Sequence, residues 1–151
     1  MQLSLHADYS LRVLIYLGTH EGEVVTTARI SQAYGISKNH LVRVMHTLGA
    51  RGYVELIPGR SGGVRLKGDP KEIRLGKVVR DAEPNMRLVE CFDMETNTCP
   101  IAGVCGLPFY LGAALEAFLR ELDKLTLHDL LTPQQRRDLA NVFVQVKMTG
   151  H

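Results

Sequence analysis

Residues 36–52 carry the pattern that most constrains how this chain can fold. Their apolar residues recur at steps of three and four, at Leu41, Val44, Met45 and Leu48. This spacing is typical of a helix that buries one face, and Ser37 stands where its first turn needs a capping hydroxyl. A shorter helix over 28–34, capped by Thr27 and ended by Gly35, is predicted just before it. Two short helices joined by a tight turn predict a helix-turn-helix.

A two-stranded hairpin is predicted directly after this pair, over residues 53–66. Apolar and polar residues alternate on both sides of a glycine-rich turn, with the apolar ones at Val54, Leu56, Val64 and Leu66. The turn, PGRSGG, carries Arg60. A helix-turn-helix followed by a basic hairpin is the winged-helix arrangement.

The other apolar segments predict helices as well. One covers residues 7–18, and another covers 73–83. The longest is predicted over 107–125, where apolar residues at steps of four and three form one seam. Such a seam needs a partner, and a second copy of the same chain is the simplest one, so we expect a homodimer. Two C-terminal helices follow, capped by Thr126 and Thr132.

These elements predict a fold that is mainly α-helical with a small β wing. We expect a winged helix-turn-helix DNA-binding domain over 1–83, a cysteine cluster-binding loop over 84–106, and a dimerisation helix with C-terminal helices over 107–151. The N-terminus has no basic leader with a cleavage site, and its short apolar run contains Asp8 and Arg12. We therefore expect neither a signal peptide nor a membrane span, and a cytoplasmic protein.

The predicted recognition helix and hairpin carry the candidate contacts to double-stranded DNA. The exposed side of the helix offers donor-rich side chains, as the first turns of a recognition helix do in the major groove. Arginine suits the edge of guanine and asparagine that of adenine, while Arg60 on the hairpin tip can enter a minor groove. Arg51, Arg65 and Lys67 are phosphate candidates. The predicted DNA-binding set is Ser37, Lys38, Asn39, His40, Arg43, Arg60, Ser61 and Arg65.

The charge distribution agrees with a DNA-binding N-terminal half. Residues 1–80 contain 12 Lys and Arg against 6 Asp and Glu, a balance of +6, whereas residues 81–151 contain 6 against 10, a balance of −4. A basic half joined to an acidic half is typical of a polyanion binder fused to another function. Ordinary solvated surface charge on a helical domain is the alternative that charge alone leaves open.

No motif in the chain predicts enzymatic activity. The GRSGG turn lacks the GK[ST] ending of a nucleotide-phosphate loop and lies in a predicted hairpin. A catalytic cysteine usually stands alone, with its histidine elsewhere in the chain, whereas the cysteines here are grouped. We therefore expect a binding protein and not an enzyme.

The three cysteines predict a metal centre that lacks one ligand. Cys91, Cys99 and Cys105 lie within fifteen residues, at a spacing of C-x7-C-x5-C. Zinc ribbons and ferredoxins usually contain C-x2-C pairs, which are absent here. Three thiolates fall one short of the four ligands that zinc or an iron–sulphur cluster takes. Composition leaves both kinds of metal centre open.

The order of these motifs resembles a known family. An N-terminal MQLSLHADYSLRVLIYL, a GRSGGVRL wing, IRLGKVVRDAEP, the three cysteines and AALEAFLRELDKLTLHDLL together resemble the NsrR-type nitric-oxide-sensing repressors. These belong to the iron–sulphur winged-helix regulators that also include IscR and RirA. The resemblance covers residues 1–131 and does not extend past Thr132.

The resemblance implies a homodimer with one [4Fe-4S] cluster per subunit. Its ligands would be the three cysteines and Asp8 from the partner subunit, with His6 as a nearby rival. A [2Fe-2S] site, the alternative, uses a histidine three residues after the last cysteine, where this chain has Pro108. The implied function is a transcriptional repressor that loses its pseudo-palindromic operator when the cluster reacts with nitric oxide. Sensing of iron status or redox poise by the same fold, and an electron-transfer or cluster-assembly protein, are the alternatives.

Overall fold

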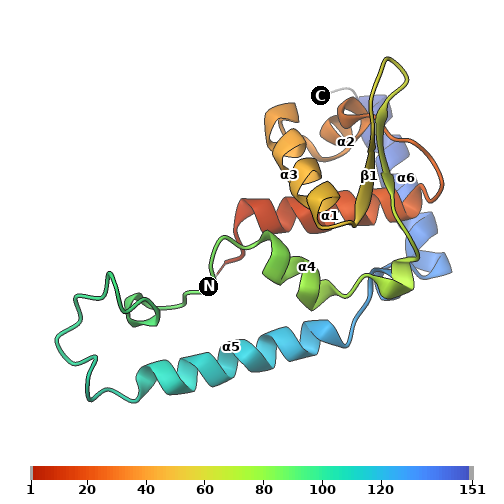
Figure 1. Ribbon diagram of the computed structural model, residues 1–151. Coiled ribbons are helices and arrows are strands. Elements are labelled where there is room, and N and C mark those ends of the chain that lie inside the picture. The colour runs from red at the N-terminus through yellow and green to blue at the C-terminus, as the bar shows by residue number, and fades with distance from the viewer. Residues whose placement is uncertain (1, 150–151) are drawn as a thin grey trace.

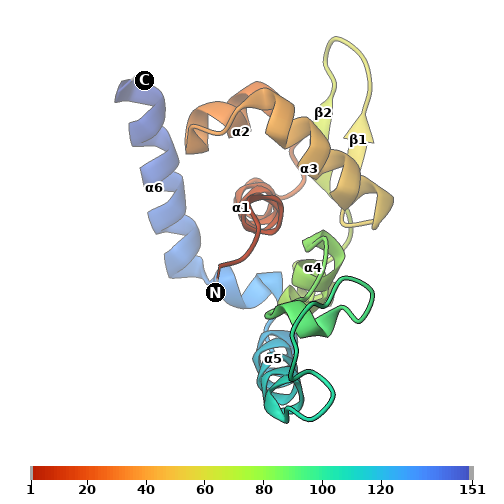
Figure 2. The same cartoon turned by 90° about the vertical axis from the view of Figure 1, so that its left-hand side faces the viewer.

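The computed structural model describes residues 2–149 of the 151-residue chain (Figure 1). Helix α1 (Leu5–Thr19) lies in the middle of the larger part, and in Figure 2, where α1 is seen end-on, the other elements surround it. These elements are α2 (Thr27–Tyr34), α3 (Lys38–Ala50), β1 (Val54–Ile57), β2 (Gly63–Leu66), α4 (Leu75–Ala82) and α6 (Pro133–Thr149). A fold that is mainly α-helical with one small antiparallel sheet is therefore confirmed.

Residues 83–123 extend from this body as an elongated segment, which we call the arm (Figure 1). It consists of the cysteine loop, with a short 3₁₀ turn over Glu90–Phe92, and of helix α5 (Leu107–Asp123), which leads back to the body. Two further 3₁₀ turns, Pro70–Glu72 and Leu127–Leu130, connect the wing to α4 and α5 to α6.

The helix-turn-helix forms where the sequence predicts it, with one correction. Thr26, and not Thr27, caps α2: its hydroxyl accepts the N–H of Arg29 at 3.3 Å. Thr26 has the extended backbone that a capping residue needs, whereas Thr27 already belongs to the helix. Gly35 ends α2 at a φ of 66°, a left-handed conformation that strains a residue with a Cβ atom. Ser37 caps α3, as predicted, by accepting the N–H of His40.

The two strands of the wing pair in antiparallel register, with Val54 opposite Leu66 and Leu56 opposite Val64. Val64 also exchanges two backbone hydrogen bonds of 2.8 Å with Val25, which fastens the base of the wing to the body. Val54 and Val64 are buried, whereas Leu56, the register partner of Val64, remains 41% exposed.

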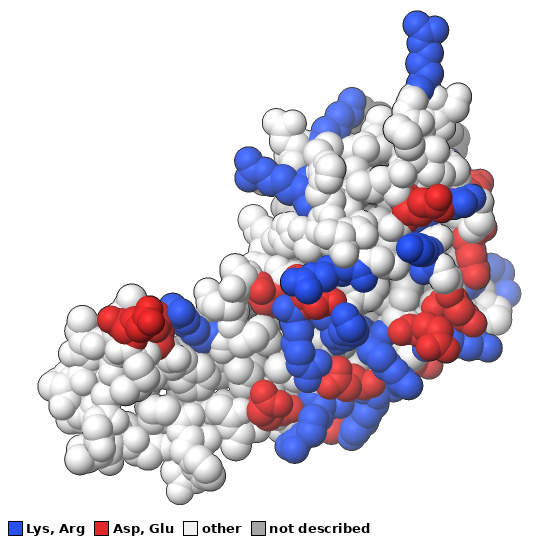
Figure 3. Space-filling view, in the orientation of Figure 1, with Lys and Arg blue, Asp and Glu red and all other residues white. Residues whose placement is uncertain are grey.

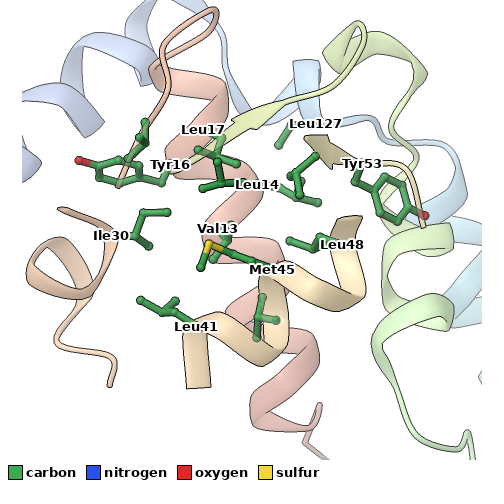
Figure 4. Packing of buried hydrophobic residues seen from close by; sticks show 14 of the residues in the cluster. Val13, Leu14, Tyr16, Leu17, Ile30, Leu41, Met45, Leu48, Tyr53 and Leu127 are labelled. Carbon is green, nitrogen blue, oxygen red and sulfur yellow. The ribbon is translucent and has the colours of Figure 1, made fainter. Parts of the chain in front are cut away.

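The core forms between α1 and the two helices of the helix-turn-helix (Figure 4). Leu14 and Leu17 of α1 meet Ile30 of α2 and Leu41 and Leu48 of α3, and all five side chains are buried. Burial of each such aliphatic side chain contributes about 1.5–3 kcal/mol. The periodic apolar face predicted for α3 is therefore the face that holds the recognition helix on α1.

Helix α5 joins the body mainly through α4. Leu119 is buried at this junction, and Gly76 of α4 approaches so closely that a Cβ atom there would lie 2.9 Å from the Leu119 carbonyl oxygen. Arg80 of α4 donates two hydrogen bonds of 2.8 Å to the two carboxylate oxygens of Asp123. Leu119 is next to a residue of the predicted apolar seam but does not belong to that seam. Leu107, the first residue of the seam, is 52% exposed.

Helix α6 returns the chain to the body. The predicted caps are confirmed: Thr126 and Asp129 form a reciprocal capping box, and Thr132 accepts the N–H of Gln135. Phe143 then packs its ring against Tyr16 and Tyr34, with centroid distances of 4.8 and 5.5 Å. No helix within residues 2–149 combines the length and apolar character that crossing a membrane requires.

Candidate DNA interface and cysteine loop

Helix α3 presents four of the predicted DNA-binding side chains to solvent. Lys38, Asn39, His40 and Arg43 are all exposed on the face opposite the core. The Ser37 hydroxyl oxygen accepts a hydrogen bond as the cap of α3, so its O–H can still donate to a phosphate. The arrangement supplies amide, imidazole and guanidinium donors on the solvent-exposed side of α3.

The wing places Arg60 and Ser61 at an exposed turn. Figure 3 shows one basic side chain projecting from the tip of the hairpin, and Arg60 is the only Lys or Arg within residues 58–62. A Cβ atom at Gly62 would lie 2.2 Å from the Ile57 carbonyl oxygen, so this turn requires glycine. The tight turn thus carries an arginine at the outermost point of the wing.

A groove of about 430 Å³ lies between α3 and the wing. Lys38 and His46 of α3, Gly59 of the wing, and Thr26 and Thr27 at the start of α2 contribute to its lining. The sequence-based set omits His46, although it follows Arg43 by three residues, a spacing that places both on neighbouring positions of one helix face. The sequence did not indicate that Thr26 and Thr27 line this groove, because only the tertiary structure brings the start of α2 close to it.

Ion pairs within the chain determine which basic side chains of α3 and the wing remain available to contact DNA. Arg65 forms a cross-strand pair with Glu55 at 2.7 Å, and Arg51 lies 3.8 Å from Asp81. Within the described part of the chain, four cations near α3 and the wing form no ion pair: Lys38, Arg43, Arg60 and Lys67. The positive charge of the basic half is therefore open for phosphate or base contacts mainly along α3 and at the wing.

The cysteine loop carries all three thiols in reduced, half-buried form. The carboxylate of Glu90 accepts both the N–H and the hydroxyl of Thr98 at 2.6 Å, which draws together the residues next to Cys91 and Cys99. The sulphur of Cys105 accepts the N–H of Leu107 at 3.4 Å. Cys105 thus lies directly beside the first turn of α5.

Three thiols on one loop fit the donor chemistry of an iron–sulphur cluster, with one ligand missing. Within residues 2–149 of a single chain, no group of three or more His, Cys, Asp or Glu side chains is arranged to hold a metal ion. The loop also exposes large apolar side chains, with Met94 81% and Val104 91% exposed. Figure 3 shows few charged side chains at this end of the arm. Exposed apolar side chains gathered on one segment are typical of an interaction surface.

Asp8, the predicted fourth ligand, lies in the first turn of α1 and not on the arm. Its carboxylate pairs with Arg12 at 2.8 Å, and the two side chains are 37% and 44% exposed. His6, the alternative fourth ligand, contacts α3 instead: its Nε2 atom lies 3.0 Å from the hydroxyl oxygen of Thr47. Both side chains are half-buried, and each already has a partner within its own chain.

Comparison with known proteins gives a consistent match. The Rrf2 family model, described as an iron-dependent transcriptional regulator, matches residues 3–133. The HTH-type transcriptional regulator NsrR of Bacillus subtilis strain 168 is 51% identical over 132 residues, which cover 87% of this chain and 90% of that protein. NsrR of Shouchella clausii is 45% identical over 150 residues, 99% of both chains, so this similarity includes α6.

A solved structure shares the arrangement of helices and wing. CymR, the global cysteine regulator of B. subtilis, aligns with a TM-score of 0.67 and 26% identity over 86% of this chain and 95% of that chain. The aligned share of this chain is larger than the winged helix-turn-helix alone.

Proposed function

The chain belongs to the Rrf2 family of transcriptional regulators, and we propose that it is a homodimeric repressor whose operator binding is controlled by an iron–sulphur cluster that reacts with nitric oxide. The observation that carries this proposal is the arm, in which three reduced cysteines on one loop are joined through α4 to a winged helix-turn-helix. A two-fold dimer presents the same helix twice, so the proposed operator is pseudo-palindromic, with half-sites about 34 Å apart or a multiple of that distance.

The exposed side of α5 supports dimerisation. Phe109 and Tyr110 are 76% and 71% exposed, and Ala113, Ala114 and Ala117 continue the apolar surface along the helix. Large exposed aromatic side chains beside small ones suit a helix that packs closely against another helix. A second copy of α5 supplies a matching surface, because a two-fold interface uses the same patch on both subunits.

The proposed cofactor is a [4Fe-4S] cluster in each subunit, with [2Fe-2S] as the alternative. Cys91, Cys99 and Cys105 supply three thiolates, and Asp8 of the partner subunit supplies an oxygen ligand. A bound cluster would offer an iron that is open to a small diatomic molecule. Carboxylate is a hard donor among soft sulphur ligands, so Asp8 would hold an iron less firmly than the three thiolates would.

The contacts of α1 explain how release of Asp8 would reach the DNA. Two residues before Asp8, His6 contacts Thr47 of α3 through its Nε2 atom. One residue after it, the ring of Tyr9 lies 6.0 Å from the ring of His40 in α3. The first turn of α1 therefore rests directly on the recognition helix. Any shift of Asp8 moves side chains that touch the DNA-reading element.

Operator binding with and without the cluster tests the proposal. Protein purified and reconstituted without oxygen is expected to contain about four irons per chain with matching sulphide. It should bind its operator at least about tenfold more tightly than the cluster-free form, a typical size for coupling between two sites, and nitric oxide should remove this advantage. Binding to random DNA is the control. Stoichiometric zinc without sulphide, or equal operator affinity of both forms, would refute the function.

Arg43 and Arg60 are expected to differ in how they contribute to DNA binding. Arg43→Ala should weaken binding by about 1–3 kcal/mol at one operator position, because it removes a base contact in the major groove. Arg60→Ala should act mainly at A·T-rich flanks, where a narrow minor groove attracts arginine. Footprints and salt titrations on operator and random DNA measure both effects. If Arg43→Ala weakens specific and random binding equally, Arg43 contacts phosphate and not a base.

A further inference from the structure

A polar cluster joins the wing, the recognition helix and α4 at one half-buried carboxylate. Asp81, near the end of α4, accepts the hydroxyl of Tyr53 at 2.6 Å and the ammonium of Lys77 at 2.8 Å. Arg51, the residue that ends α3, approaches the same carboxylate at 3.8 Å. Tyr53 immediately precedes β1 and is only 7% exposed. One side chain of α4 therefore contacts both elements of the DNA-binding face.

The protonation states of this cluster are fixed near neutral pH. Burial opposes ionisation of Asp81, but hydrogen bonds from Lys77 and Tyr53 outweigh it and hold the pKa of its carboxyl below the ordinary value. Burial and the hydrogen bond to Asp81 raise the pKa of Tyr53 well above its ordinary value. The tyrosine thus always donates and the carboxylate always accepts, so the contact depends on position and not on titration.

The same helix end also holds the arm and α1. Arg80, next to Asp81, makes the two hydrogen bonds to Asp123 of α5. Glu83, at the end of α4, accepts the N–H of Ser4, the residue that caps α1, at 2.7 Å. Cys91 follows Glu83 by only eight residues. The last turn of α4 is therefore tied to the arm, to α1 and to the wing at once.

We propose that α4 carries the state of the cysteine loop to the wing and the recognition helix, and that Tyr53 and Asp81 are the positioning pair in this path; the inference rests on the function proposed above. A hydrogen bond of 2.6 Å is lost once its atoms separate by about 1 Å more. A small shift of α4, imposed when the loop changes its ligands, would thus break the link between α4 and the residue that precedes β1. This path uses other side chains than the contacts of His6 and Tyr9 with α3.

Tyr53→Phe tests this path, because it removes one hydroxyl and keeps the buried ring. The quantity to measure is the ratio of operator dissociation constants between cluster-free and cluster-loaded protein. Tyr53→Phe is expected to lower this ratio by a factor of about 3–10, the value of one hydrogen bond. Iron content and the rate of reaction with nitric oxide should equal those of wild type. A purely structural pair would weaken both forms alike and leave the ratio unchanged, which would overturn the inference.

Tyr34→Phe is the matched control. The Tyr34 hydroxyl donates to the Arg12 carbonyl oxygen at 3.0 Å, away from α4. The ratio of operator dissociation constants of Tyr34→Phe should therefore equal that of wild type. An equal loss of ratio in this control would also overturn the inference. If the cluster-free and cluster-loaded forms of the wild-type protein have the same operator dissociation constant, the proposed function itself is refuted. The role of Tyr53 and Asp81 in coupling the cluster to the DNA is then refuted with it.

Hydrogen exchange on the wild-type protein gives a test that needs no variant. Removal of the cluster should change amide exchange in α4 and, together with it, in β1 and β2. Exchange that changes in α4 and the loop while both strands keep their rates would overturn the inference even if Tyr53→Phe fails to fold.

Discussion

Replacement of any one of Cys91, Cys99 or Cys105 by Ala is expected to abolish the cluster. The three thiols are the only cysteines of the chain and lie on one loop. Because the fourth ligand is expected from another subunit and is an oxygen, loss of one of the three thiolates leaves only two protein sulphurs, too few to hold an iron–sulphur cluster. Iron per chain should fall from about four to near zero, and operator affinity should fall to that of cluster-free wild type. Iron and sulphide analysis with absorption spectra measures the effect.

Met94→Ala is the matched control for these variants. Met94 is a sulphur-containing residue of the same loop and is 81% exposed, so its loss removes no thiolate and little packing. It should retain full iron and sulphide. If one of the three cysteine variants also retains them, that cysteine is not a ligand, and the four-ligand assignment has to be revised.

Asp8→Ala is expected to separate cluster binding from DNA binding. Three thiolates should still hold a cluster, but it should be lost faster, and its presence should no longer strengthen operator binding. Asp8→Cys should have the opposite effect on stability, because thiolate suits iron better than carboxylate does, and it should slow the reaction with nitric oxide. Stopped-flow loss of cluster absorption and operator titrations measure both variants.

The ion pair of Asp8 cannot account for such an effect. Asp8 and Arg12 form an exposed pair four residues apart on one helix, and pairs of this kind contribute only about 0.3–0.5 kcal/mol. Arg12→Gln breaks the same pair and leaves Asp8 in place, so it should behave like wild type. If Asp8→Ala matches wild type in cluster lifetime, nitric oxide rate and operator affinity, Asp8 serves only the start of the helix.

The helix-turn-helix and wing could be predicted from the sequence because their signals are local. The spacing of Leu41, Val44, Met45 and Leu48 specifies a buried helix face whatever that face meets. Gly35 and the glycines of the wing turn mark backbone that other residues strain to adopt. For the same reason the buried positions of α3 also predicted its exposed ones, among them Lys38, Asn39, His40 and Arg43.

The sequence could name the three cysteines but not what lies near them. Spacing and residue type are properties of the chain, whereas the neighbours of Asp8, His6 and Glu90 depend on how α1, α3 and the arm fold together. The cap of α2 was placed one residue late because Thr26 and Thr27 are identical in type, and only backbone conformation distinguishes them.

Tertiary structure alone decided the contacts between distant segments. Phe143 reaches Tyr16 and Tyr34 across more than a hundred residues, and Asp81 meets Tyr53 across twenty-eight. No periodicity encodes such pairs, because each requires two elements to be oriented by the rest of the core. The sequence by itself thus determined which helices and strands form, because backbone preference and apolar periodicity act within a few residues, and it supplied the candidate residues for binding iron and DNA. How α4 connects the arm to the wing was decided by packing, which acts between residues that the chain keeps far apart.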